Sequence, residues 1–330
     1  MRILLSRTDR IGDLILSTPA IATVRASFPS AHLTIVTSGY NVAAVERNAY
    51  IDEVRAIPPG VKPGKFARVF RGQVDLAIAL APRSADFAIV GATRAPVRIG
   101  YTYVRRYFAR LTWRRYLTQL ALSEADPGLL ERDPRRPVQH EVDQLLDLVA
   151  RAGATQRVED LRVDIEDRDR AAVARLPSDS LTFHLADHWL NCGSTLANTI
   201  ELLGELRSFG LPIVVTHAAE HRAQAEEISH ANVADAVIDN LTFHEWVAAF
   251  ERARCIVTVD TGATHVASAV GKPTVVAFEH RYFALSSREW APYHVPHAIV
   301  RKPAGESVRE LRQLRSDIVS GVARLLDGTI

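Results

Sequence analysis

The sequence predicts an α/β protein of two Rossmann-like, doubly wound parallel-sheet domains that face an inter-domain cleft. Its 330 residues suffice for about two domains of roughly 150 residues each. Short apolar runs alternate with longer amphipathic stretches almost from end to end, which is typical of parallel strands covered by helices on both faces. A segment rich in Asp, Glu and Arg interrupts this alternation near the middle. We therefore expect a first domain at 1–155, a crossover at 156–178 and a second domain at 179–330.

Apolar runs predict the strands, and apolar residues at helical spacing predict the helices. In the first half we expect strands at 2–5, 32–36, 53–57, 76–79 and 97–99, with helices at about 13–27, 40–47, 65–72, 83–91 and 141–151. One further strand is expected near 161–163. In the second half we expect strands at 181–184, 212–216, 235–238, 255–259 and 274–278, with helices at about 195–208, 219–230, 242–253 and 263–270. The last helical pattern, at about 308–326, is expected to pack back on the first domain.

The composition is that of an ordinary globular protein, with 47% hydrophobic and 24% charged residues. Forty basic against thirty-eight acidic residues leave a net charge of only +2, so any anionic partner must be held by a local patch. Cys192 and Cys255 are the only cysteines, which fits a reducing compartment and argues against a zinc site. The N-terminal apolar run is too short for a signal peptide, and no long uncharged apolar window follows. We expect a cytoplasmic protein.

The loop after the first strand, 7–13, carries the first candidate site. The carboxyl ends of parallel strands border the ligand crevice, so this loop should face it. Asp13 falls in the first helical turn, where the helix dipole should keep its carboxylate ionised, with an ordinary pKa near 3.9. Asp13 is therefore a candidate general base, Asp9 is a rival on the same loop, and simple helix capping is the structural alternative. Neither a dinucleotide fingerprint nor a P-loop is present, which disfavours dehydrogenases and kinases.

A second candidate site follows the strand at 255–259. Asp260, Thr261 and Gly262 lead into a helix that carries His265. Free amides at the helix start, the Thr261 hydroxyl and the His265 ring together suit a diphosphate. The structural alternative is an Asp-Thr cap followed by a histidine that faces the core.

A third feature is the arginine-rich stretch from Arg94 to Arg115, which contains seven arginines, no acidic residue and interleaved aromatic residues. Guanidinium groups bind carboxylates and phosphates, and aromatic faces suit sugar rings or lipid headgroups. We expect this stretch to border an anionic ligand, with a solvated basic helix as the alternative.

These motifs, in this order, resemble glycosyltransferase family 9, the heptosyltransferases of lipopolysaccharide assembly. The residues that carry the resemblance are Arg10-Ile11-Gly12-Asp13 with Thr18-Pro19, His140-Glu141-Val142-Asp143, Asp260-Thr261-Gly262 with His265, and Gly271-Lys272-Pro273-Thr274. The resemblance implies the GT-B fold, with an acceptor-binding domain first and a nucleotide-sugar domain second. It implies an inverting transfer without metal or other cofactor, from ADP-heptose to the hydroxyl of an anionic, membrane-bound glycolipid or saccharide.

The resemblance also implies roles for individual residues. Asp13 matches the family's proposed base, and Asp260, Thr261, Gly262 and His265 match its donor-phosphate loop. Glu220 matches a carboxylate that holds the donor ribose. On the acceptor side we place four arginines, Arg10, Arg98, Arg105 and Arg106. Peripheral contact with the inner membrane face is expected, and nucleic acid is not an expected partner.

One departure from the family pattern concerns the segment after the strand at 181–184. Family members usually have a Lys or Arg there that pairs with the donor phosphates, whereas this chain has none before Arg207. His188, or the hydroxyls of Ser194 and Thr195, are the candidate substitutes. The departure keeps two alternatives to a transferase open: a nucleotide-sugar epimerase of the same architecture, and a non-catalytic protein with a degenerate sugar-nucleotide site.

Overall fold

The computed structural model describes residues 1–191 and 193–330, so Cys192 lies outside the described residues. The chain divides into two compact units, Met1–Arg162 and Val163–Ile330. This division falls inside the segment that the sequence predicts as the crossover.

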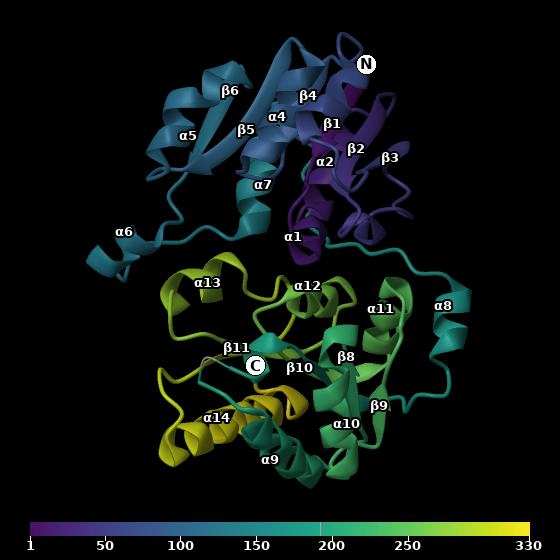
Figure 1. Ribbon diagram of the computed structural model, residues 1–330, viewed down its shortest axis with the longest axis vertical. Helices are drawn as coiled ribbons and strands as arrows, with labels where there is room; N and C mark the ends of the chain where they lie inside the picture. The colour runs from purple at the N-terminus through teal and green to yellow at the C-terminus, as the bar shows by residue number, and fades with distance from the viewer. Residues whose placement is uncertain (192) are drawn as a thin grey trace. The chain divides into compact units, whose positions relative to one another are not determined.

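Each unit is built on one six-stranded parallel sheet with helices on its faces (Figure 1). The strand order is β3-β2-β1-β4-β5-β6 in the first sheet and β12-β11-β10-β7-β8-β9 in the second. Counted from the start of each unit, the two orders are the same, and both are the Rossmann order. The predicted α/β class with two doubly wound sheets is confirmed. The strands are β1 (Arg2–Ser6), β2 (His32–Ser38), β3 (Glu53–Ile57), β4 (Leu76–Ala79), β5 (Val97–Tyr103), β6 (Gln119–Ser123), β7 (Ser180–Leu185), β8 (Ile213–His217), β9 (Ala236–Ile238), β10 (Ala253–Val259), β11 (Thr274–Phe278) and β12 (His297–Arg301).

Helices and short 3₁₀ turns connect these strands. In the first unit they are α1 (Ile11–Leu16), α2 (Thr18–Ser27), η1 (Val42–Ala44), α3 (Pro63–Phe66), η2 (Ala67–Phe70), α4 (Ser84–Thr93), α5 (Tyr107–Thr112), η3 (Trp113–Arg115), α6 (Pro127–Arg132) and α7 (Glu141–Ala150). In the second unit they are α8 (Asp167–Ala172), η4 (Asp187–Trp189), α9 (Leu196–Leu206), η5 (Arg207–Phe209), η6 (Ala219–His221), α10 (Arg222–His230), α11 (Phe243–Glu251), α12 (Gly262–Ala269), α13 (Phe283–Glu289) and α14 (Val308–Leu326). No helix of the described residues combines the length and the apolar character needed to cross a bilayer.

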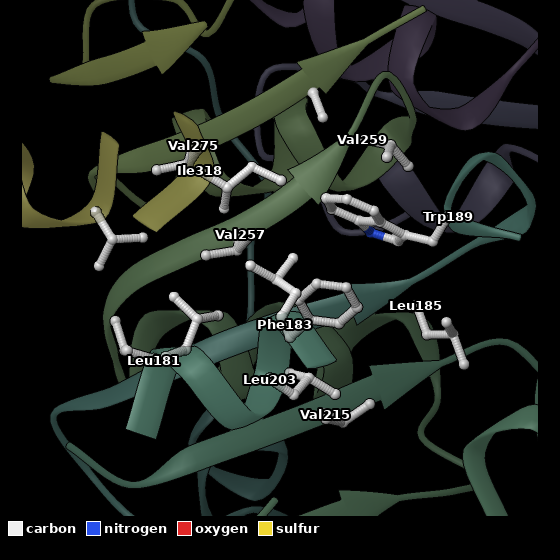
Figure 2. Close-up of a cluster of buried hydrophobic side chains, with 14 of the residues drawn as sticks. Leu181, Phe183, Leu185, Trp189, Leu203, Val215, Val257, Val259, Val275 and Ile318 are labelled. Carbon is white, nitrogen blue, oxygen red and sulfur yellow. The ribbon is translucent and has the colours of Figure 1, made fainter. Parts of the chain in front are cut away.

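The core of the second unit explains where the final helix packs. Figure 2 shows side chains from β7, β8, β10 and β11 meeting Ile318 of α14 in one apolar cluster. Ile318 and Val322 are fully buried there. At Gly321 a Cβ would lie only 3.1 Å from the Cβ of Ala298, so glycine lets α14 approach β12 closely. The apolar face of α14 therefore packs within the second unit.

The expected crossover at 156–178 is shared between the two units. Its start belongs to the first unit, because the Arg162 amide donates to Thr18 Oγ1 at 3.0 Å. The strand expected near 161–163 does not form. Its later part belongs to the second unit, where Arg170 of α8 forms an ion pair with Glu251 of α11 at 2.7 Å.

Two strands that the sequence analysis missed, β6 and β12, lie at the edges of the two sheets. Their apolar runs are only three residues long, Leu120–Leu122 in β6 and Ala298–Val300 in β12, shorter than in a central strand. The central strands position the candidate sites. In each sheet the order reverses between two neighbouring strands, β1 and β4 in one and β7 and β10 in the other, and ligands bind at such switch points.

Candidate functional site

A buried arginine organises the carboxyl edge of the first sheet. Arg7 follows β1 directly, and its side chain is only 2% exposed. Its guanidinium lies 2.8 Å from Asp9, 2.9 Å from Glu141 and 3.4 Å from Asp13, and it also donates to the Leu80 carbonyl oxygen. One positive charge thus faces three carboxyl groups. Burial disfavours a charged guanidinium, but the attraction of these acids raises the pKa of Arg7 well above its ordinary value.

Asp13 differs from the other two acids in its exposure and its proton affinity. Its side chain is 21% exposed, against 12% for Asp9 and 1% for Glu141. Burial raises the pKa of Asp13 to about 6, with a further increase from Asp9 and Glu141 that Arg7 opposes. The sequence analysis assumed an ordinary pKa for Asp13, whereas in the structure loss of solvent and the like charges of Asp9 and Glu141 outweigh the attraction of Arg7 and Arg10. Asp13 is still mostly ionised at neutral pH and is a stronger base than an ordinary aspartate.

Glu141 is held on both sides. It is the first residue of α7, and its Oε1 accepts hydrogen bonds from Arg7 at 2.9 Å and from the Tyr101 hydroxyl at 2.7 Å. Burial and the negative charge of Glu141 raise the pKa of Tyr101 well above its ordinary value, so the phenol stays protonated and donates. The sequence analysis used Glu141 only as part of a motif, and its position at the start of a helix was the available signal.

Asp86 is a second carboxyl group with a raised pKa, and the sequence analysis missed it. It lies in the first turn of α4, fully buried, and accepts hydrogen bonds from Ser6 Oγ at 2.6 Å and Thr8 Oγ1 at 3.0 Å. Burial raises the pKa of Asp86 to about 6, although these two hydroxyls lower it. An acidic residue at a helix start after a neighbouring apolar strand was the signal that could have found it.

The four arginines expected on the acceptor side occupy different surroundings. Arg10 is exposed at the N-cap of α1 and lowers the pKa of Asp13. Arg98 lies near the start of β5, and its guanidinium donates to the carbonyl oxygens of Tyr116 (2.7 Å) and Ala95. Arg105 and Arg106 are exposed just before α5. Arg10 is close enough to Asp13 to affect its pKa, whereas the guanidinium of Arg98 holds backbone on both sides of β5.

In the second unit, the turn after β10 places the predicted donor-phosphate residues at the start of α12. Thr261 is the N-cap, but its hydroxyl donates to the Val259 carbonyl oxygen at 3.3 Å and does not cap the helix. The helix begins at Gly262, and Asp260, Thr261 and Gly262 are half-exposed. The positive end of the helix dipole is therefore available to an anion. His265, one turn later, is only 5% exposed and faces the interior.

The loop after β7 carries the proposed substitutes for the missing cation. His188 Nδ1 lies 3.4 Å from Glu279, which follows β11, so a charged imidazole ring would be balanced there. The Thr195 hydroxyl caps α9 by accepting from the Asn198 amide at 3.1 Å. Ser194 is fully buried. The side chain of His188 is 39% exposed, and Thr195 is also half-buried.

A lysine from elsewhere in the unit holds this loop. Lys302 follows β12, is 1% exposed, and donates to the carbonyl oxygens of His188 and, at 2.9 Å, of Asn191. The same strand end approaches Gly193, where a Cβ would lie 2.2 Å from the Pro303 carbonyl oxygen. The sequence analysis looked for a cation within the loop and missed Lys302, which lies more than a hundred residues later in the chain. The only sequence signal was a Lys at the end of an apolar strand.

Glu220 lies in η6, after β8, and is exposed. The strand β8 is the neighbour of β7, so Glu220 lies on the same carboxyl edge as the Thr261–Gly262 turn. Nearby, burial and the charges of His221 and His217 lower the pKa of His184 to about 3, so its ring is neutral and bonds to Thr216 Oγ1 at 3.0 Å.

Part of the second unit matches the model of a known protein family. Residues 198–313 match the model of Glycosyltransferase family 9 (heptosyltransferase). The match spans 116 of the 330 residues, so the chain resembles this family over about a third of its length. The match lies inside the second unit and includes the turn at 260–262 and Lys302, but it begins after the atypical loop at 186–194. The predicted resemblance to family 9 is confirmed, and it supports a glycosyltransferase. No curated protein sequence matches the chain.

Solved structures of low sequence identity share the fold. The E. coli ADP-heptose lps heptosyltransferase II is similar with a TM-score of 0.75, 18% identity and 100% of each chain covered. A glycosyl transferase family 9 structure from Veillonella parvula DSM 2008 gives a TM-score of 0.74 at 16% identity, covering 98% of this chain and 97% of the other. The UDP-GlcNAc 2-epimerase from Methanocaldococcus jannaschii gives 0.58 at 12% identity, with 99% and 93% covered. The predicted GT-B fold class is confirmed.

Asp86→Asn tests whether burial sets the proton affinity of the first site. The pKa of Asp86 is about 6 in the folded chain and near 3.9 in an unfolded one, so folding loses stability as the pH rises through this window. Because asparagine does not titrate, Asp86→Asn lacks this loss of stability. Relative to the unchanged chain, we expect its free energy of unfolding to increase by at most about 3 kcal/mol between about pH 4 and pH 7, measured by urea unfolding.

Asp52→Asn is the control of opposite sign. The Leu33 amide and Arg25 lower the pKa of Asp52, so its contribution to stability is present at neutral pH and lost in acid. This variant should be weakened more at neutral pH than in acid. A difference for Asp86→Asn that does not change with pH would contradict our interpretation.

Lys302→Met removes the cation that holds the loop after β7. Because two backbone carbonyl groups lose a charged donor, we expect amide hydrogen exchange at 186–191 to become about tenfold faster or more, while α12 is unaffected. Lys272→Met, at the half-buried lysine after α12, is the matched control. Unchanged exchange in the loop of the Lys302 variant would show that the lysine does not hold it.

Proposed function

We propose that the chain is an inverting glycosyltransferase that moves a heptose-like sugar from a nucleoside diphosphate to a saccharide hydroxyl, with Asp13 as the general base. The observation that carries the proposal is the state of Asp13. It is a partly exposed carboxylate with a raised pKa, held by Arg7 at the switch point of its sheet, in a chain whose second unit matches family 9.

ADP-heptose is the proposed donor, and an anionic saccharide or glycolipid of lipopolysaccharide or another surface glycan is the proposed acceptor. The name of the E. coli heptosyltransferase that shares the fold supports this donor and this pathway. The exposed arginines Arg10, Arg105 and Arg106 in the first unit suit an anionic acceptor. The proposal includes a cytoplasmic location with peripheral contact at the inner membrane face.

In the proposed reaction the acceptor oxygen forms a bond to the anomeric carbon as the bond from that carbon to the diphosphate oxygen breaks. The acceptor proton passes to Asp13. A carboxylate with a pKa near 6 cannot deprotonate a free sugar hydroxyl in advance, so the proton moves late, when the new bond has made the oxygen acidic. Arg7 holds the carboxylate in place through its 3.4 Å contact and limits how far its pKa rises.

The leaving diphosphate gains negative charge, and the second unit offers two groups to stabilise it. They are the positive end of α12 at Thr261–Gly262 and the loop that carries His188. Lys302 acts on this loop through its carbonyl groups and so fixes its backbone. Glu220 is the proposed partner of the donor ribose. No metal or other cofactor is assigned a role.

Asp13→Asn tests the base. The variant keeps the size of the side chain but cannot accept the proton, so we expect the rate of sugar transfer to fall by about 10²–10⁴ while donor affinity is retained. Asp9→Asn is the comparison, since Asp9 is the rival base and is less exposed. A larger loss for Asp9→Asn would reassign the base. Conversion of the donor without acceptor would indicate an epimerase, and absence of any nucleotide-sugar binding would indicate a degenerate site.

Glu141→Gln tests the electrostatic cause of the raised pKa. Removing this negative neighbour, and freeing more of the Arg7 charge for Asp13, lowers the pKa of Asp13. The acid limb of the pH profile of kcat/KM should therefore move to lower pH by about one unit. Asp143→Asn, on the same helix but paired with Arg157, should leave that limb in place. An acid limb that stays put in Glu141→Gln would refute this account.

A further inference from the structure

The first unit exposes an unusual set of side chains on and around α5. Three large apolar residues of this short helix, Tyr107, Phe108 and Leu111, are 65%, 79% and 82% exposed. Their spacing places them on one face of the helix, and no residue of α5 is buried. Five exposed arginines surround them, at 105, 106, 110, 114 and 115. We call these eight residues the α5 surface.

The arginines of the α5 surface are largely uncompensated. No acidic residue occurs between 94 and 115. Among the described residues, Arg105 alone of the five has a carboxylate within ion-pair distance, that of Asp126 at 3.5 Å. Arg106 and Arg110 donate to the carbonyl oxygens of Pro82 and Val104, which orients the guanidinium groups without neutralising them. The surface therefore combines exposed apolar area with a net positive charge.

The hydrogen bonds also place the α5 surface relative to the catalytic edge of the first unit. The helix follows β5, whose Tyr101 donates to Glu141. Arg106 reaches Pro82, which lies between β4 and the helix that carries Asp86. In Figure 1, α5 is drawn at the β6 end of the first sheet. The surface thus adjoins the carboxyl edge on which Asp13 lies.

We propose that the α5 surface docks the protein on an anionic lipid bilayer. Phe108 and Leu111 enter the boundary between headgroups and acyl chains, Tyr107 lies at headgroup level, and the arginines bind lipid phosphates. A second copy of the chain is a poor occupant, because two such surfaces would bring their arginines together. The inference rests on the proposed function only for its purpose, which is to bring a membrane-bound acceptor to Asp13.

Vesicle sedimentation of the full chain tests the proposal. The probes are vesicles of phosphatidylcholine alone and vesicles with about a third of phosphatidylglycerol, at low and at high salt. We expect binding to the anionic vesicles to be about tenfold stronger or more, and to weaken in salt. Phe108→Ser with Leu111→Ser, and separately Arg110→Ala with Arg114→Ala, should each lose most of this binding.

The matched control is Tyr40→Ser with Val69→Ser, which removes two apolar side chains of the same unit that are 71% and 65% exposed. It should bind like the unchanged chain, and all variants should keep its unfolding temperature. Equal binding to both kinds of vesicle, or α5 variants that bind normally, would overturn the proposal. The proposal would also be overturned if the unchanged chain is a dimer without lipid and an α5 variant is a monomer, because the α5 surface would then be a dimer interface.

The proposed function fails separately. Sugar transfer to a lipid-free acceptor saccharide should persist in the Phe108→Ser, Leu111→Ser variant. If the unchanged chain binds anionic vesicles but never transfers sugar, the docking surface stands and the transferase proposal falls. If the unchanged chain transfers sugar but does not bind anionic vesicles, the transferase proposal stands and the docking surface falls.

Discussion

The charge of one buried guanidinium determines the chemistry of the first unit. Arg7 lies among Asp9, Asp13 and Glu141, and a single positive charge cannot balance three negative ones in an interior that excludes water. Burial, together with the charges of Asp9 and Glu141, raises the pKa of Asp13, the most exposed of the three, and Arg7 opposes this rise. The partial exposure of Asp13 also leaves it accessible to a ligand, whereas Glu141 is completely enclosed. The contact with Arg7 thus holds the Asp13 carboxylate and affects its pKa.

The candidate anion-binding edge of the second unit is arranged differently. Its loop after β7 lacks a cation, and the lysine that serves it, Lys302, directs its charge to backbone carbonyl groups. In the proposed function, the groups of this edge that face the donor diphosphate are the end of α12 and the ring of His188. The family 9 match starts just beyond this loop, which is where the chain departs from the family pattern.

Because the two sheets have the same strand order, each presents its reactive groups at an equivalent place. In the first unit the edge continues into α5, where exposed apolar and basic side chains suit a charged interface. A helix that exposes three large apolar residues gains nothing from folding alone, so its composition calls for a partner. The anionic membrane that we propose as this partner would bring an acceptor to the edge that bears Asp13.

The sequence by itself determined the fold class, most of the central strands and the positions of Asp13 and the turn at 260–262. These depend on short-range patterns, such as an apolar run followed by a helix start, that are visible within about ten residues. Tertiary structure decided the partners: Arg7 meets Glu141 across 134 positions, Ser6 meets Asp86 across 80, and Lys302 reaches His188 across 114. It also decided that Arg98, counted among ligand-binding arginines, bonds to backbone carbonyl groups. Burial and proton affinity arise from such distant contacts, which no local pattern encodes.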